Sequence, residues 1–353
     1  MLNNLRAKLL SIKFRAIRRF VITVLAKIPR DLERAIIFGD TLNHFLMITP
    51  FRYFFKFKVP KDIQTNLYDL SFASPLISAS FKDDVSSLLQ WQLLGIGGIT
   101  YKTVLKKPSK GNLRPRIQEI SYQGEYGILN SLGLPNKGVE KFKLSIPNKK
   151  LMNFNRPIGV SIGGNSDKEY FEVFNSIDRY LNSIDYDQFF YEINISCPNT
   201  EDGKCLSDDL DSLKKLLEKF RNVSSRVIFV KVSPDSSVDD ILSICNILSK
   251  IEKTVINVGN SKYVRASNVG LTQKTFSKEG GGLSGKYLYK NTLKMVQLIS
   301  SKYSIPIVAT GGVCSYGQVK QLLDNGATLT GMATLLVTDP LLIPQINQRL
   351  SNE

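Results

Sequence analysis

Histidine is almost absent from this chain of 353 residues, which contains only one, His44. It stands near the N-terminus, apart from every other candidate site residue. Ser-His-Asp catalysis, histidine-bound zinc and HExxH chemistry are therefore excluded from the main body of the chain. Proton abstraction near neutral pH must fall there to a Cys, Lys, Tyr or carboxylate side chain.

Cysteine and long apolar runs are scarce as well. The four cysteines show neither the paired spacing of a metal site nor a disulfide framework, which favours a reducing compartment: Cys197, Cys205, Cys245 and Cys314. No run reaches the roughly 20 apolar residues of a membrane-spanning helix. Hydrophobic residues nevertheless make up 42% of the chain, an ordinary content for a globular protein with a large core.

Acidic residues are missing from the first thirty positions. Residues 1–60 hold twelve Lys or Arg against Asp31, Glu33 and Asp40, so this region carries about half of the net charge of +16. Such a basic block is typical of an arm that binds an anionic surface, either lipid or nucleic acid.

The basic residues of this arm follow a helical pattern. Residues 3–28 mix apolar and basic side chains at helical spacing, Pro29 interrupts, a second helix is expected over 31–47, and an aromatic and basic run fills 51–58. Basic amphipathic helices lie in membrane interfaces. We predict that residues 1–60 bind a membrane surface, and we expect no nucleic-acid partner. The alternatives are a helical pair that only packs on the rest of the chain, a cleavable targeting peptide and a nucleic-acid arm.

From about residue 67, short apolar runs alternate with amphipathic stretches. Strands are predicted near 68–78, 96–100, 157–162, 190–195, 226–232, 254–259, 305–310 and 328–332. Helices are predicted at 83–93, 167–184, 207–222, 236–251, 287–302, 315–325 and 339–350. Eight strands with crossover helices predict an α/β fold, a (β/α)8 TIM barrel over residues 61–353 behind an N-terminal helical extension. Residues 103–150 are expected to form an insertion that covers the site.

One stretch, Glu192–Thr200, concentrates unusual residues at the end of a predicted strand. Asn194, Cys197 and Asn199 follow the apolar run, and Pro198 ends it because proline cannot donate to a sheet. In parallel barrels the chemistry lies on the loops after the strands. The alternative is a turn whose amides cap the backbone and whose thiol is simply buried.

Small residues follow the last two predicted strands. Gly311 and Gly312 come after the seventh strand, whereas Ala333 and Thr334 come after the eighth. Small residues let backbone N–H groups approach a phosphate, which barrels often bind at this place. The segment Gly280–Gly285 is expected to be another permissive loop.

A lysine and several loop asparagines complete the set of candidates. Lys231 lies inside an apolar strand. Burying a cation there is costly unless it meets an anion or an electron-rich ligand. The alternative is a lysine that reaches solvent at the end of the strand. Asparagines recur in loops near 130, 194–199 and 260. Amides and a lysine suit a planar anionic ligand such as a pyrimidine carboxylate.

These motifs together resemble the dihydroorotate dehydrogenases, the FMN enzymes of pyrimidine (UMP) biosynthesis. The resemblance spans roughly residues 67–345 in unbroken order. Its most specific segments are 130–136 (NSLGLPN), 194–199 (NISCPN), 281–285 (GGLSG) and the spacing from Lys102 through Gly111 to Arg116. The resemblance implies oxidation of dihydroorotate to orotate, with a hydride passing to N5 of FMN.

The resemblance also implies residue roles. Cys197 is the expected base that removes the C5 proton, and Lys102 is the second expected catalytic residue. The implied substrate-binding residues are Lys102, Asn130, Ser131, Leu132, Gly133, Leu134, Asn194, Asn199, Asn260 and Ser261. The implied FMN-binding residues are Ala79, Ser80, Thr103, Asn194, Lys231, Ser261, Ser284, Gly285, Gly311, Gly312, Ala333 and Thr334. No metal is expected.

The electron acceptor is less directly implied, because the sequence resembles two classes of the family. Cys197 and Lys102 match the cytosolic class, whereas the basic N-terminal extension matches the membrane-bound quinone class. We predict a quinone acceptor and a peripheral membrane location on the cytoplasmic side, with a cytoplasmic protein as the alternative. The sequence also fits a fumarate- or NAD-coupled enzyme, a dihydrouracil-type dehydrogenase or a basic membrane-binding barrel without activity. It leaves the oligomeric state open.

Overall fold

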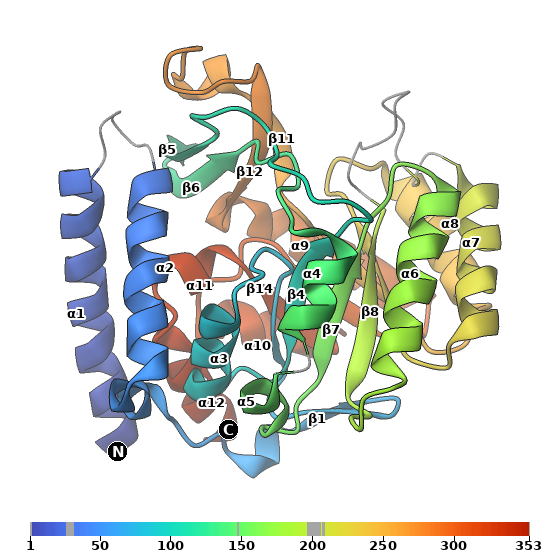
Figure 1. Ribbon diagram of the computed structural model, residues 1–353, viewed down its shortest axis with the longest axis horizontal. Coiled ribbons are helices and arrows are strands. Elements are labelled where there is room, and N and C mark those ends of the chain that lie inside the picture. Colours follow the sequence, from blue (N-terminus) through green and yellow to red (C-terminus); the bar gives the residue numbers. More distant parts are fainter. Residues whose placement is uncertain (1, 26–31, 147, 196–205, 207–208, 353) are drawn as a thin grey trace.

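The computed structural model describes residues 2–25, 32–146, 148–195, 206 and 209–352 (Figure 1). At its centre is a sheet of eight parallel strands in the order β3-β14-β13-β10-β9-β8-β7-β4. A parallel bridge between Ile77 and Gly98 joins the two end strands, so the sheet closes into a barrel. The strands are β3 (Leu76–Ser78), β4 (Ile99–Val104), β7 (Ile158–Ile162), β8 (Phe189–Asn194), β9 (Ile228–Val232), β10 (Thr254–Val258), β13 (Ile307–Thr310) and β14 (Leu329–Met332). The predicted (β/α)8 barrel is confirmed.

Helices surround the barrel, as the amphipathic stretches predicted. They are α3 (Val85–Leu94), α6 (Asp167–Leu181), α7 (Leu210–Val223), α8 (Val238–Leu248), α9 (Tyr289–Lys302), α10 (Tyr316–Asp324), α11 (Thr334–Thr338) and α12 (Leu342–Ser351). Side-chain caps begin several of them: the Asp84 carboxylate accepts from the Ser87 N–H, and Ser166 caps α6 in the same way. The apolar faces of these helices pack on the outside of the barrel in one continuous core.

The predicted strand 68–78 is wrong, because this run contains a turn. The structure has an antiparallel hairpin, β1 (Thr65–Leu67) and β2 (Leu70–Phe72), followed by the separate strand β3. Tyr68, in the turn, has a φ of 54°, and Pro75 comes just before β3. The hairpin's apolar side chains join the cluster at the start of the barrel strands and plug that end.

A second sheet lies at the opposite end of the barrel, where the strands finish (Figure 1). It is a four-stranded antiparallel sheet in the order β11-β12-β6-β5. The insertion supplies two of its strands and the helices that follow; the elements are β5 (Ile117–Tyr122), β6 (Glu125–Asn130), β11 (Lys262–Arg265), β12 (Gly280–Gly285), α4 (Gly138–Ser145) and α5 (Lys149–Met152). The loop predicted at 280–285 is therefore wrong. Its glycines serve close strand pairing, since a Cβ on Gly281 would lie 2.3 Å from the Asn130 carbonyl oxygen.

The N-terminal extension forms two helices, α1 (Leu2–Leu25) and α2 (Glu33–Ile48), which lie side by side against one flank of the barrel (Figure 1). Short 3-10 turns follow, η1 (Pro50–Phe55) and η2 (Lys61–Ile63). Ser11 fixes α1 to the end of the chain by donating a hydrogen bond of 2.5 Å to Asp339. None of the described helices combines the length and apolar character that crossing a membrane requires.

Candidate active site

The inside of the barrel changes from apolar to polar along its strands. The apolar level consists of Ile77, Phe190, Phe229, Val255, Val308 and Leu329. Side chains two positions further along a strand point to the same face. The next level therefore consists of Ala79, Glu192, Lys231, Asn257, Thr310 and Gly331. Polar groups thus gather at the ends of the strands, where barrels carry out chemistry.

A chain of hydrogen bonds links this polar level. The Glu192 carboxylate, 1% exposed, accepts from the Ser80 hydroxyl at 2.5 Å and from the Asn257 amide at 2.8 Å. The Thr310 hydroxyl donates to the Asn257 side-chain oxygen at 2.7 Å. The Lys231 ammonium, in a side chain that is 6% exposed, lies 3.4 Å from the Ser80 hydroxyl and 4.0 Å from Glu192. Glu192 therefore balances the buried lysine, and these long contacts suit an additional electron-rich partner.

Beside this chain, the ends of β4, β7 and β8 form a second polar group. The Thr103 and Ser161 hydroxyls are 3.0 Å apart, and the Asn194 amide donates to the Thr103 hydroxyl at 3.3 Å. The Tyr170 hydroxyl fixes the backbone at Asn194 by donating to its carbonyl at 2.7 Å. The structure thus brings Thr103 and Asn194 together at the strand ends.

The four-stranded sheet brings further predicted residues to the same end. The Asn130 amide donates to the Gly282 carbonyl at 3.0 Å, and a Cβ on Gly282 would lie 2.1 Å from the Ser261 hydroxyl. The Asn260 side chain accepts from the Ser261 N–H at 2.9 Å. The buried Ser131 hydroxyl has no hydrogen-bond partner among the described residues. An unsatisfied buried hydroxyl of this kind is suited to hold a ligand.

Lys102 occupies a strongly cationic part of the site. Its pKa is lowered to about 8, mainly by burial; Asp83 opposes this shift, and the nearby cations Lys82, Arg116 and Lys137 contribute to it. A small hollow beside Lys102 is lined by residues of β4, the preceding loop and the start of α4: Asp83, Tyr101, Lys102, Thr103, Val104, Asn136, Lys137, Gly138 and Phe142. Such a concentration of positive charge favours a small anionic ligand.

Backbone close to the ends of β13 and β14 leaves room for a phosphate. Gly311 and Gly312 have φ values of 135° and 73°, conformations that favour glycine. A Cβ on Gly331 would lie 2.0 Å from the Thr310 hydroxyl, so no larger residue fits there. Together with the buried ammonium of Lys231, these features fit the predicted cofactor FMN: glycine N–H groups for its phosphate and a cation for its ring.

The remaining predicted residues that the structure describes fall in three places. Gly133 and Leu134 form a left-handed turn, with Leu132 before them. On the four-stranded sheet, the Ser284 hydroxyl beside Gly285 donates to the Ile128 carbonyl at 3.3 Å. Ala333 precedes α11, which begins at Thr334. Cys197 and Asn199 lie outside the described residues.

Sequence reasoning missed three polar residues of the barrel interior: Glu192, Asn257 and Thr310. Each interrupts an apolar strand at the position two residues beyond a buried apolar side chain. This period of two was the signal that would have identified them. Arg116 was noted only as part of a motif, although its guanidinium organises the loops around Lys102.

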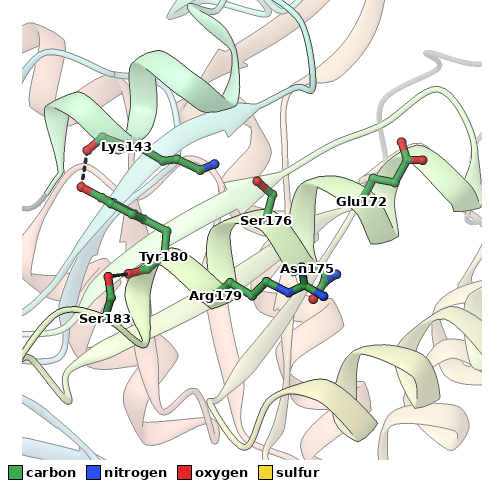
Figure 2. A pocket seen from close by; sticks show the side chains of 7 residues that line it. All are labelled: Lys143, Glu172, Asn175, Ser176, Arg179, Tyr180 and Ser183. Atoms are coloured by element: carbon green, nitrogen blue, oxygen red, sulfur yellow. Dashed lines mark hydrogen bonds between the residues drawn. The ribbon is translucent and has the colours of Figure 1, made fainter.

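A hollow on the outside of the barrel is unrelated to this site (Figure 2). Its lining comes from α4, α6 and the turn after α6: Lys143, Glu172, Asn175, Ser176, Arg179, Tyr180 and Ser183. Tyr180 bridges the two helices by donating to the Lys143 carbonyl. None of these lining residues comes from a strand end, where barrels carry their chemistry.

Comparison with known proteins agrees with the geometry. The sequence profile of the family described as dihydroorotate dehydrogenase matches residues 62–353. The chain is 29% identical over 291 residues to the Fusobacterium nucleatum protein named dihydroorotate dehydrogenase B (NAD(+)), catalytic subunit, covering 80% of this chain and 90% of the relative. It is 28% identical over 305 residues to the Wigglesworthia glossinidia brevipalpis protein named dihydroorotate dehydrogenase (quinone), covering 82% and 87%.

A solved structure shares the fold. The crystal structure of DHODH from Eimeria tenella in complex with ferulenol superposes with a TM-score of 0.74 at 19% identity, covering 94% of each chain. The match of the family profile to most of the sequence bears out the family that the motifs predicted. This chain belongs to the dihydroorotate dehydrogenase family of FMN-dependent oxidoreductases.

Proposed function

We propose that this protein oxidises dihydroorotate to orotate and passes the electrons to a quinone at a membrane surface. The reaction rests on the family and on the cationic surroundings of Lys102. The acceptor rests on one observation, the outward apolar face of the N-terminal helices.

At the substrate end, Lys102 binds the carboxylate of dihydroorotate. The amides of Asn130, Asn194, Asn199 and Asn260 offer donors and acceptors in the plane of the ring. Ser131 supplies a hydroxyl that is buried and otherwise unpaired among the described residues. These groups orient the substrate so that its C5 proton faces Cys197.

Cys197 acts as the base that removes this proton. A thiol has an ordinary pKa of roughly 8.5, which a neighbouring cation lowers, so a thiolate is accessible near neutral pH. When bound, FMN would supply the acceptor for the hydride from C6. Lys231, which Glu192 keeps in place, would hold a positive charge near its ring.

The acceptor proposal depends on the orientation of α1. Its barrel-facing side is held by a few contacts: Ala7 and Ser11 are buried, Leu10 and Phe14 pack on the core, and Arg18 binds Glu119 at 2.6 Å. Six other large apolar residues of α1 are 52–69% exposed: Leu5, Leu9, Ile12, Ile17, Phe20 and Val24. A helix that only packed on the barrel would bury this stripe.

The exposed apolar surface continues beyond α1. α2 and η1 add Ile37, Phe38, Leu42, Phe45, Ile48, Phe51, Tyr53 and Phe54. Exposed cations surround it: Lys8, Lys13, Arg15, Arg19, Arg34, Lys56 and Lys58. Apolar side chains among basic ones suit an anionic membrane interface, where a lipid-dissolved quinone is available.

A second candidate is NAD+ as acceptor. It is favoured by the similarity to the Fusobacterium nucleatum protein, whose name specifies NAD(+). The exposed apolar face has no role in electron transfer to NAD+, so we rank this acceptor second.

The experiment compares acceptors directly. The protein is reduced anaerobically with dihydroorotate and mixed with a quinone in anionic vesicles, with NAD+ or with fumarate, while flavin absorbance is followed. We expect rapid reoxidation by the quinone only, and sedimentation of the protein with the vesicles. The double variant Leu9→Ser/Ile12→Ser should lose vesicle binding, whereas Leu144→Ser, at a residue 79% exposed elsewhere, should keep it. Reoxidation by NAD+ or fumarate without vesicle binding would refute the acceptor.

A further inference from the structure

The inward side of α2 carries the acidic residues of the N-terminal arm that the structure describes. Glu33 and Asp40 are seven residues apart, or about two helical turns, and so lie on the same side of the helix. The arm is otherwise basic. Both acids contact cations that border the substrate end of the site.

Glu33 contacts the loop that shapes the substrate end. Its buried carboxylate accepts from the Arg116 Nε at 3.1 Å and forms an ion pair with Arg114 at 2.9 Å. The same Arg116 guanidinium donates to the carbonyls of Lys110 and Asn112, at 2.8 Å each. One arginine therefore joins α2 to the loop before β5.

Arg116 also holds the segment after β6. Its guanidinium reaches the Leu132 carbonyl at 3.4 Å, and its own carbonyl accepts from the Ser131 N–H at 2.8 Å. The Asn112 amide donates to the Ser131 carbonyl at 2.8 Å. The conformation of residues 131–132 thus depends on the position of Arg116, which Glu33 fixes from α2.

Asp40 contacts the other side of the substrate end. Its two carboxylate oxygens lie 2.5 and 2.6 Å from the Lys82 ammonium. The Lys82 carbonyl accepts from the Lys102 N–H at 3.0 Å, so this ion pair lies directly beside the candidate substrate lysine. His44 and Asn43 extend the same contact to Ser86 and Ser87 at the start of α3.

We propose that Glu33 and Asp40 are positioning residues of α2, which hold the substrate loop and the Lys82–Lys102 segment in the conformation that binds dihydroorotate. This inference rests on the proposed function, because it takes Lys102 and residues 131–134 as the substrate end. Glu33 has the larger role, since its pair with Arg116 is buried whereas the Asp40 side chain is 43% exposed.

One consequence is coupling between the membrane and the substrate. If vesicle binding orders α2, it favours the loop conformation that binds orotate, and orotate favours vesicle binding by the same factor. A helix pair that served only as an anchor would show no such coupling.

The test uses the full-length, FMN-loaded protein and the variant Glu33→Gln, with Glu218→Gln on the exposed face of α7 as a matched control. We expect Glu33→Gln to raise the dihydroorotate KM and the orotate Kd by about tenfold, with kcat and FMN content within about twofold of wild type. Asp40→Asn should raise both constants by a smaller factor. Loss of stability alone would reduce kcat and FMN content together.

Two results would overturn the inference. The first is an unchanged dihydroorotate KM and orotate Kd in Glu33→Gln. The second applies if Glu33→Gln does not fold: Asp40→Asn then has an unchanged orotate Kd, and anionic vesicles leave the orotate Kd of wild type unaltered. The proposed function fails separately, by the absence of flavin reduction in wild type with dihydroorotate. If dihydroorotate reduces the flavin of wild type but the variants bind orotate normally, only the positioning role is refuted.

Discussion

Replacing Lys102 with methionine should stabilise the ligand-free protein while it weakens orotate binding. Burial lowers the pKa of Lys102 from 10.5 to about 8, so the charged form is disfavoured in the folded state. Each pKa unit corresponds to 1.36 kcal/mol, and the penalty at neutral pH is therefore about 3 kcal/mol. Methionine has a similar length and no charge, so Lys102→Met should recover about 2–3 kcal/mol of unfolding free energy at pH 7.

The direction of the pH dependence follows from the same shift. Below pH 8 the lysine is charged in both folded and unfolded states, and the folded state bears the whole penalty. Between pH 8 and 10.5 the folded state loses its proton first, so the stability of wild type rises relative to the variant. The difference between the two proteins should therefore shrink as the pH increases through this window.

Urea unfolding at saturating FMN, at pH 7 and at pH 9.5, measures this difference. Lys219→Met, at an exposed position on α7, is the control and should show little change at either pH. Orotate titrations should show an affinity loss of about tenfold or more in Lys102→Met, because a charge-assisted hydrogen bond contributes about 1.5–3 kcal/mol. If Lys102→Met is less stable than wild type at pH 7, or if the stability difference between the two proteins does not change with pH, burial does not disfavour the charged form of Lys102.

Three further changes test other parts of the structure. Gly331→Ala should lower FMN retention and the Tm because its Cβ would lie 2.0 Å from the Thr310 hydroxyl. Gly317→Ala, on helix α10 with open space around its Cβ, should lower neither FMN content nor Tm. Glu192→Ala should lower the free energy of unfolding, measured by urea titration, by about 3–5 kcal/mol, because it leaves buried Lys231 without its carboxylate. A loss below about 1 kcal/mol would contradict the pairing. Asp339→Ala should speed hydrogen exchange in α1 by removing the Ser11 contact while exchange in the barrel strands stays slow, and equal acceleration throughout would argue against local docking.

The barrel could be predicted from sequence because its strands are buried on both faces and are separated by amphipathic helices. The run 226–232, for example, corresponds to β9 (Ile228–Val232). The hairpin at 65–72 was missed because apolar and polar residues alternate through it and up to β3, so hydropathy alone does not mark the turn at Tyr68. β12 was missed because glycines have low strand propensity, and only pairing with β6 and β11 makes this segment a strand.

The site was predicted in parts. The motif residues could be named from the sequence. The structure places those that it describes around the barrel mouth and on the four-stranded sheet beside it. The partners that hold them could not be named, because such pairs join distant segments: Glu192 bonds to Ser80 and Asn257, and Glu33 to Arg116. Only the closed barrel and the docked helices bring these residues together.

The most direct test of the proposed function is anaerobic addition of dihydroorotate to the FMN-loaded protein, while the flavin band near ~450 nm is followed. We expect the band to bleach on addition, and we expect Cys197→Ser to slow the bleaching severely near neutral pH, because serine is a far weaker acid than cysteine. A flavin-loaded protein whose band dihydroorotate leaves unchanged would contradict the proposed function.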